Sequence, residues 1–105
     1  MQIFFNGGFH DSDEKLLSIQ DCGLCFADGL FEVIRCMGGK FLLFSKHIER
    51  MKESAAFLRM EFPYSKDELL VACKELSKRN EIQDGELYLE ITWDEAPIGA
   101  NLVDC

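Results

Sequence analysis

Apolar runs on either side of glycine turns open the chain. Apolar residues flank Asn6-Gly7-Gly8, and an Asn-Gly pair supplies the positive φ angles that a tight hairpin turn requires. Residues 30–37 and 40–44 are rich in β-branched and aromatic side chains and flank Gly38-Gly39 in the same way. The pattern therefore predicts two β-hairpins.

The strand expected at residues 30–37 does not alternate cleanly. Phe31, Val33 and Cys36 cannot all lie on one face of a strand with strict period two. We therefore expect a bulge in this strand or burial of both of its faces. The preceding residues 21–29 mix glycines and aspartates without a sustained period, which predicts a loop.

Two amphipathic helices are predicted after the hairpins. The first runs from an N-cap at Ser45 to about Met60. The second begins at a capping box, Ser65-Lys66-Asp67-Glu68, and ends at about Arg79. Apolar residues recur at three- and four-residue steps in both helices, so each has one core-facing stripe. The expected stripes are Ile48, Met51, Ala55 and Leu58 in the first helix and Leu69, Ala72, Cys73 and Leu76 in the second.

A final strand completes the predicted fold. From Leu87 to Trp93, apolar residues alternate with polar or amphipathic ones, which is typical of a half-buried strand. The order of elements predicts an α+β fold, in which a mostly antiparallel sheet of about five strands has two helices packed on one face. With 105 residues, the chain is long enough for one core, so residues 1–105 are expected to form a single domain.

Charge narrows the range of partners. The formal net charge of -8 repels phosphate backbones and anionic lipid surfaces, so we expect no nucleic-acid and no membrane partner. A single small anion held locally stays compatible with this charge. No apolar run approaches membrane-spanning length, and residues 1–6 lack a basic segment, so a cytoplasmic protein is expected.

The cysteines predict reduced thiols. Their number, five, is odd, and no secretion signal accompanies them, which argues against a disulfide framework. Cys22 and Cys25 form a C-x-x-C pair, a spacing that redox pairs and zinc sites use. No second such pair and no paired histidines follow in the sequence, so we expect no metal site.

The remaining candidate chemistry is local. The sequence has no nucleophile motif and no glycine-rich phosphate loop. His47 and Arg50 stand three residues apart near the start of the first predicted helix, so they lie on neighbouring sides of it. The planar guanidinium of Arg50 can hold a phosphate through two hydrogen bonds. Arg50 is therefore the leading anion-binding candidate; the alternatives are a solvated arginine and a histidine bonded to the backbone.

Several stretches together resemble the fold-type IV aminotransferases, which include D-amino-acid transaminases, branched-chain aminotransferases and aminodeoxychorismate lyases. Residues 21–32 read DCGLCFADGLFE and are similar to the family pattern D-R-G-x-x-F-G-D-G-x-Y/F-E. Val33-Ile34-Arg35, a glycine-turn hairpin and the H-x-x-R of His47 and Arg50 follow in the family's order. The resemblance covers nearly the whole chain and implies that the chain is the family's small N-terminal domain.

The resemblance implies pyridoxal phosphate as the cofactor of the full-length family enzyme. Arg50 would hold its phosphate with support from His47, and Phe31, Tyr88 and Ile98 would line the substrate pocket. A C-terminal domain, absent from this chain, would carry the lysine that forms a Schiff base with the cofactor. The seven lysines of this chain fall on predicted loops and polar helix faces. We therefore assign no catalytic residue and expect the chain alone to be inactive and to retain no cofactor.

Departures from each subfamily leave the substrate open. D-amino-acid transaminases carry a tyrosine at the position of Phe31, and an arginine and a histidine at the positions of Ile98 and Ala100. Branched-chain enzymes have Y-x-R where this chain has Tyr88-Leu89-Glu90. The R-G-x-G-G-R-G segment of aminodeoxychorismate lyases is not matched after the last predicted strand.

Three hypotheses follow. The first is an N-terminal domain or fragment of a pyridoxal-phosphate-dependent class IV aminotransferase or lyase that acts on an amino acid or amine. The alternative is a stand-alone, non-catalytic domain that binds a small anion or a protein partner. The third is a redox or metal module built on Cys22 and Cys25. Without a C-terminal domain, part of the apolar surface of this chain is left uncovered. We therefore expect a homo-oligomer.

Overall fold

The computed structural model describes residues 1–17 and 29–92. Every strand pair among them is antiparallel, which confirms an α+β fold with two helices and about five strands. The strands divide between a two-stranded sheet, β1-β2, and a three-stranded sheet in the order β4-β3-β5. The elements are β1 (Gln2–Phe5), β2 (Gly8–Asp11), β3 (Gly29–Met37), β4 (Lys40–Phe41), α2 (Phe44–Phe57), α3 (Lys66–Arg79) and β5 (Gly85–Thr92).

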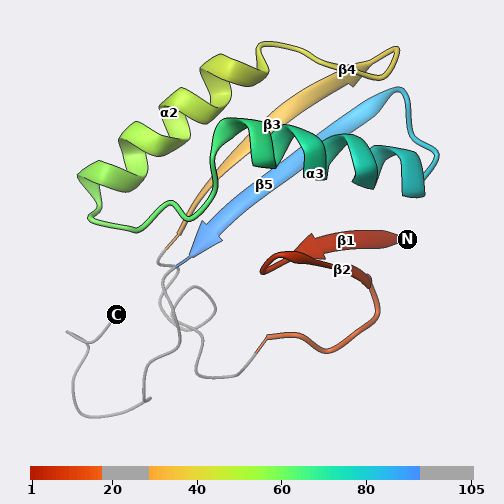
Figure 1. The fold of residues 1–105 in the computed structure, drawn as a ribbon, viewed down its shortest axis with the longest axis horizontal. Helices are drawn as coiled ribbons and strands as arrows, with labels where there is room; N and C mark the ends of the chain where they lie inside the picture. The colour runs from red at the N-terminus through yellow and green to blue at the C-terminus, as the bar shows by residue number, and fades with distance from the viewer. Residues whose placement is uncertain (18–28, 93–105) are drawn as a thin grey trace.

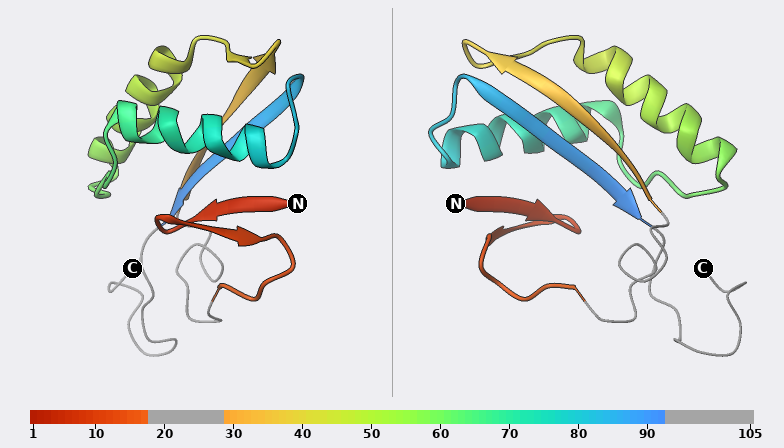
Figure 2. Two further views of the ribbon diagram at one scale, coloured as in Figure 1. Left: turned by 45° about the vertical axis from the view of Figure 1, so that its right-hand side comes forward. Right: turned by 180° about the vertical axis from the view of Figure 1, so that it is seen from behind.

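Both helices cover the same face of the three-stranded sheet (Figure 1). Seen from behind, the opposite face of this sheet has neither of the two described helices in front of it (Figure 2). The alternation of β3 explains this arrangement, since Glu32, Ile34 and Cys36 are buried and the residues between them are exposed. The core between the sheet and the helices is a cluster of five buried residues: Ile34, Phe44, Ile48, Leu69 and Cys73.

Strand β3 is regular over its whole length. Its pairing with β5 continues without a break, so the expectation of a bulge or of burial on both faces is wrong. Phe31 and Val33 lie exposed on the uncovered face instead. A glycine fits the first residue of β3 because the backbone there approaches β5 closely: a Cβ at Gly29 would lie 2.9 Å from Cγ2 of Thr92.

Both predicted hairpins are confirmed. Strands β1 and β2 turn at Asn6-Gly7, whose φ angles of 47° and 87° are those of a turn that matches the twist of a hairpin. Strands β3 and β4 pair on either side of Gly38-Gly39. Strand β4 is shorter than the predicted strand at residues 40–44 because α2 already begins at Phe44.

Helix α2 begins one residue before the predicted N-cap. Leu43 occupies the N-cap position with a left-handed φ of 55°, and its side chain makes no capping hydrogen bond. The prediction of Ser45 is wrong because the earlier start turns Phe44 into the core beside Ile48, one turn later. Burial of this phenylalanine, worth about 1.5–3 kcal/mol, offsets the roughly 1–2 kcal/mol that a left-handed residue costs.

The apolar stripe of α2 is largely as predicted. Ile48, Met51 and Ala55 are buried. Leu58 is exposed, since the helix ends before it and the chain no longer follows the helical period. Met60 is buried in its place.

Helix α3 has the predicted boundaries. The amide of Glu68 donates to Oγ of Ser65 at 3.1 Å, and the amide of Ser65 donates to the carboxylate of Glu68 at 3.3 Å, which completes the capping box. The helix ends at Arg79 and Asn80 caps it. Asn80 also holds the first hairpin: its Oδ1 accepts from the amide of Gln2 at 2.7 Å, and its Nδ2 donates to the carbonyl of Gln2 at 2.8 Å.

The covered face of α3 is narrower than predicted. Leu69 and Cys73 are buried, whereas Ala72 and Leu76 are half-buried. Burial raises the pKa of the Cys73 thiol to about 12, so this thiol stays protonated at neutral pH. Residues 1–17 and 29–92 contain two helices, α2 and α3. Neither of them is long and apolar enough to cross a membrane.

We predict that Ile34→Ala lowers the free energy of unfolding by about 3 kcal/mol, because Ile34 is completely buried and its truncation leaves a cavity. Val33→Ala is the matched control on the uncovered face of the same strand, with an expected loss below about 1 kcal/mol. Urea denaturation followed by circular dichroism measures both. Equal losses would contradict the placement of Ile34 in the core.

Candidate functional site

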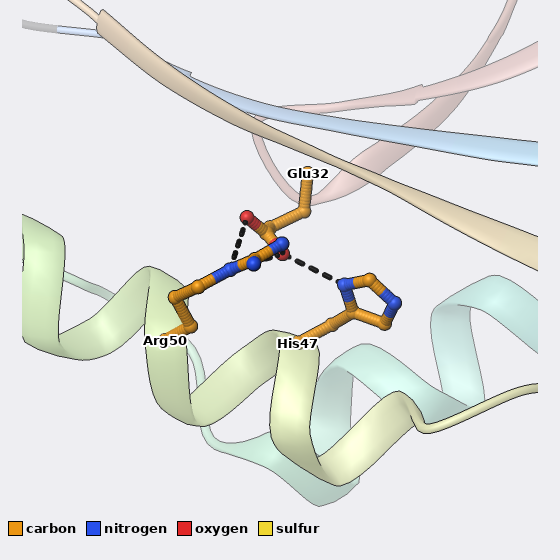
Figure 3. A network of polar contacts seen from close by, with 3 residues as sticks. All are labelled: Glu32, His47 and Arg50. Atoms are coloured by element: carbon orange, nitrogen blue, oxygen red, sulfur yellow. Dashed lines mark hydrogen bonds and ion pairs between the residues drawn. The ribbon is translucent and has the colours of Figure 1, made fainter.

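A buried carboxylate joins β3 to α2. Glu32 is 8% exposed and points from the covered face of the sheet toward the helix (Figure 3). Nδ1 of His47 lies 2.7 Å from its Oε1, Nε of Arg50 lies 3.1 Å from both carboxylate oxygens, and Nη2 of Arg50 lies 2.5 Å from Oε1. The structure thus brings the candidates His47 and Arg50 together, and it does so through Glu32. We call these three residues the carboxylate cluster.

Glu32 is not among the site residues predicted from the sequence, although a signal for its role exists. In an uninterrupted strand, Glu32 shares a face with Ile34 and Cys36, both of which are apolar. A charged side chain on a core face is rarely buried unless it is paired. Because a bulge was expected in β3, Glu32 was not assigned to the same face as Ile34 and Cys36. Its need for a partner on α2 was therefore not predicted.

The cluster holds Glu32 in its charged form. Burial acts to raise the pKa of Glu32, but the hydrogen bonds from Arg50 and His47 and the charges of these two residues outweigh it, so the pKa lies below its usual value of 4.5. An ionised carboxylate can only accept hydrogen bonds, so Nδ1 of His47 carries the proton that it donates to Glu32. The hydrogen bond and charge of Glu32 in turn raise the pKa of Arg50.

Arg50 keeps part of its guanidinium available to a ligand. Its side chain is 66% exposed, and only Nε–H and one N–H of Nη2 are used by Glu32. No further acceptor for Arg50 is found in the part of the chain that the structure describes. Both N–H groups of Nη1 and the second of Nη2 are therefore donors that a phosphate oxygen can accept.

Two other candidates lie together on the uncovered face of the sheet. The ring centroids of Phe31 and Tyr88 are 5.4 Å apart with 14° between the ring planes, and the residues are 59% and 58% exposed. We call them the aromatic pair. Ile98, the third candidate for the substrate pocket, lies outside the described residues, as do Cys22 and Cys25.

The carboxylate cluster and the aromatic pair occupy opposite faces of β3 at the same level, because Phe31 and Glu32 are consecutive residues of one strand. Strand β4 pairs only with Cys36 and Met37. Further along β3, residues 29–34 pair with β5 on one side, and no described strand pairs with their other edge. At this level β3 is therefore the outermost strand of the described sheet. Only the width of β3 separates the two faces of the sheet at its free edge.

The lowered pKa of Glu32 predicts acid sensitivity. A carboxyl group with a lower pKa in the folded chain contributes stability above about pH 4.5, and this contribution is lost as the pH falls through the folded pKa. We expect the free energy of unfolding to fall more steeply in the wild type than in Glu32→Gln when the pH is lowered from about 6 to about 3. Urea midpoints across this range measure the difference.

Glu49→Gln is the matched control for this experiment. Glu49 is an exposed acid on α2, outside the carboxylate cluster, and its substitution changes the net charge equally. It should keep the pH dependence of the wild type. If the Glu32→Gln curve is as steep as that of the wild type, the cluster does not stabilise the ionised carboxylate.

Known proteins match this chain in sequence. The family model for amino-transferase class IV matches residues 29–104. The D-alanine aminotransferase of Staphylococcus haemolyticus is 38% identical over 96 residues, which are 91% of this chain and 34% of that protein. The D-alanine aminotransferase of Bacillus licheniformis is 38% identical over 97 residues, 92% of this chain and 34% of that protein. The chain therefore spans about a third of the length of the curated relatives it matches.

Solved structures match the fold. The branched-chain amino acid aminotransferase of Escherichia coli superposes with a TM-score of 0.85 at 25% identity, over 95% of this chain and 35% of that chain. The T.th. branched-chain enzyme complexed with N-(5'-phosphopyridoxyl)-L-glutamate has a TM-score of 0.84 at 27% identity, over 93% of this chain and 34% of that chain. The match of the family model over most of the chain and the agreement in fold show that the chain belongs to the class IV aminotransferases, a family that depends on pyridoxal phosphate.

Proposed function

We propose that residues 1–105 are the small N-terminal domain of a pyridoxal-phosphate-dependent class IV aminotransferase or lyase acting on an amino acid or amine. The observation that carries this proposal is Arg50, which Glu32 holds by one side of its guanidinium while the other side stays open to solvent. In this role the domain provides contacts to the cofactor phosphate and to the substrate. The rest of the longer protein provides the remaining groups of the site.

Arg50 is proposed to bind the phosphate of the cofactor. Its free N–H groups form the planar, charged donor set that matches phosphate oxygens. His47 supports it indirectly, because its Nδ1 donates to the same carboxylate oxygen as Nη2 of Arg50. When bound, pyridoxal phosphate supplies an electron sink for the carbanion formed on the substrate. The contribution of this chain is to hold and orient that group by its phosphate.

The aromatic pair is proposed to form part of the substrate wall, together with Ile98. The stacked rings of Phe31 and Tyr88 present a flat, mostly apolar surface at the level of the carboxylate cluster. Glu90 lies directly opposite Phe31 in the register of β3 and β5. An acid beside the wall attracts an amino group and repels a carboxylate, which supports an amine or an unusual amino acid as the substrate.

We propose that another part of the longer protein carries the lysine of the reaction. Lys66 is half-buried and the other six lysines of this chain are exposed. None of the seven donates a hydrogen bond to the carboxylate cluster. None of them lies in the buried surroundings that activate a lysine as a nucleophile. The chain by itself is therefore expected to be inactive.

A chimera tests the phosphate contact. We expect this chain to replace the matching third of the Staphylococcus haemolyticus D-alanine aminotransferase, and the chimera to retain pyridoxal phosphate after desalting, as measured by visible absorbance. Arg50→Ala in the chimera should weaken cofactor binding by roughly tenfold to a hundredfold, the effect of losing charge-assisted hydrogen bonds. The isolated chain should retain no cofactor.

Lys46→Ala is the control for the chimera, since Lys46 is an exposed cation on the same helix and its loss changes the net charge equally. It should bind the cofactor as the unmodified chimera does. If Arg50→Ala also binds unchanged, Arg50 does not hold the phosphate. A folded chimera that retains no cofactor would favour the alternative of a stand-alone, non-catalytic domain.

We further propose that the isolated chain, without the rest of the longer protein, self-associates through the uncovered face of the sheet. Apolar surface of this kind tends to be covered by a partner, and the exposed apolar residues of this face are Phe31, Val33, Met37 and Tyr88. Light scattering at roughly tens of micromolar should show a dimer or a larger oligomer. Phe31→Glu should shift it toward monomer, whereas Phe57→Glu, at an exposed residue of α2, should not. A wild type that is purely monomeric would contradict the proposal.

A further inference from the structure

We infer that Glu32 is a positioning residue that determines which N–H groups of Arg50 are offered to a phosphate. This inference rests on the proposed role of Arg50. Glu32 takes Nε–H and one N–H of Nη2, so the Nη1 end of the guanidinium is the part left for an anion. The side chain of Glu32 is itself fixed in place, because it lies on the buried face of β3 and accepts a hydrogen bond from His47.

The reason that positioning matters is the freedom of an exposed arginine. With 66% of its side chain exposed, Arg50 has little packing to order it apart from Glu32. A free arginine samples many rotamers, and a bound anion has to immobilise them. For one long side chain this immobilisation corresponds to roughly threefold to tenfold in the dissociation constant. Because Glu32 has already ordered Arg50, the anion does not have to.

Charge and position act in opposite directions, which makes the role of Glu32 testable. The negative charge of Glu32 repels a phosphate, so removal of that charge alone would tighten phosphate binding. In Glu32→Gln, the amide also presents donors to the donors of Arg50 and cannot accept at both oxygen positions. Loss of positioning would therefore weaken phosphate binding. The sign of the change separates the two effects.

Titration of the chain with inorganic phosphate, followed by NMR of the arginine Nε–H signals, measures this sign. The wild type is expected to bind with a dissociation constant of roughly a millimolar. Glu32→Gln should bind roughly three to ten times more weakly, and the control Glu49→Gln should bind as the wild type does. Unchanged or tighter binding in Glu32→Gln would overturn the inference and leave the role of Arg50 intact. No response of Arg50 in the wild type would overturn the phosphate contact itself, and the inference with it.

A double-mutant cycle distinguishes positioning from a merely structural role. Arg50→Lys keeps the charge but removes the planar fork that Glu32 orients. In that background, Glu32→Gln is expected to tighten phosphate binding, because only the repulsion is left to remove. An equal loss of affinity in both backgrounds would mean that Glu32 acts on the fold rather than through Arg50, and the inference would fail.

A measurement on the wild type covers the case in which Glu32→Gln does not fold. The Nε–H proton of Arg50 donates to both oxygens of Glu32, so its exchange with water should be several times slower than that of Arg35. Arg35 is exposed and makes no ion pair within the described part of the chain. Equally fast exchange of the two protons would overturn the inference without any variant.

Discussion

The pairing of Glu32 with His47 and Arg50 is the constraint on which the arrangement of β3 and α2 depends. A carboxylate on the core face of a strand is costly to bury unless hydrogen-bond donors reach it. Both donors come from one turn of α2, next to Ile48 in the core. The helix can satisfy Glu32 and bury Ile48 only in one rotation about its axis, so a polar contact and an apolar one together set its position on the sheet.

The same strand separates the two kinds of contact that the proposed function requires. Alternation along β3 directs Glu32 to the helices and Phe31 to the uncovered face. The carboxylate cluster and the aromatic pair therefore stand at one level of the sheet, on opposite faces of β3. In the proposed function, two consecutive residues of β3 thus serve the two sides of the site: Glu32 holds the proposed phosphate contact, Arg50, and Phe31 belongs to the proposed substrate wall.

Much of the fold could be predicted from the sequence because the signals are local. The Asn6-Gly7 turn, the capping box of Ser65 and Glu68, and the alternation of β5 each depend on residues within a few positions of one another. Arg50 and His47 could be named as candidates for the same reason, since their spacing places them on neighbouring sides of a helix. The proposal that Arg50 contacts an anion was based on the chemistry of its guanidinium alone.

The sequence by itself determined the turns, the caps of α3 and the apolar stripes, because short-range hydrogen bonds and side-chain periodicity decide them. Only the tertiary structure decided that Leu43 begins α2 and that Glu32 is the partner of His47 and Arg50. Leu43 adopts its left-handed conformation because Phe44 is buried against distant residues. Glu32 meets residues 15 and 18 positions away. Such contacts depend on how the helix packs on the sheet, and no local pattern of residues contains that information.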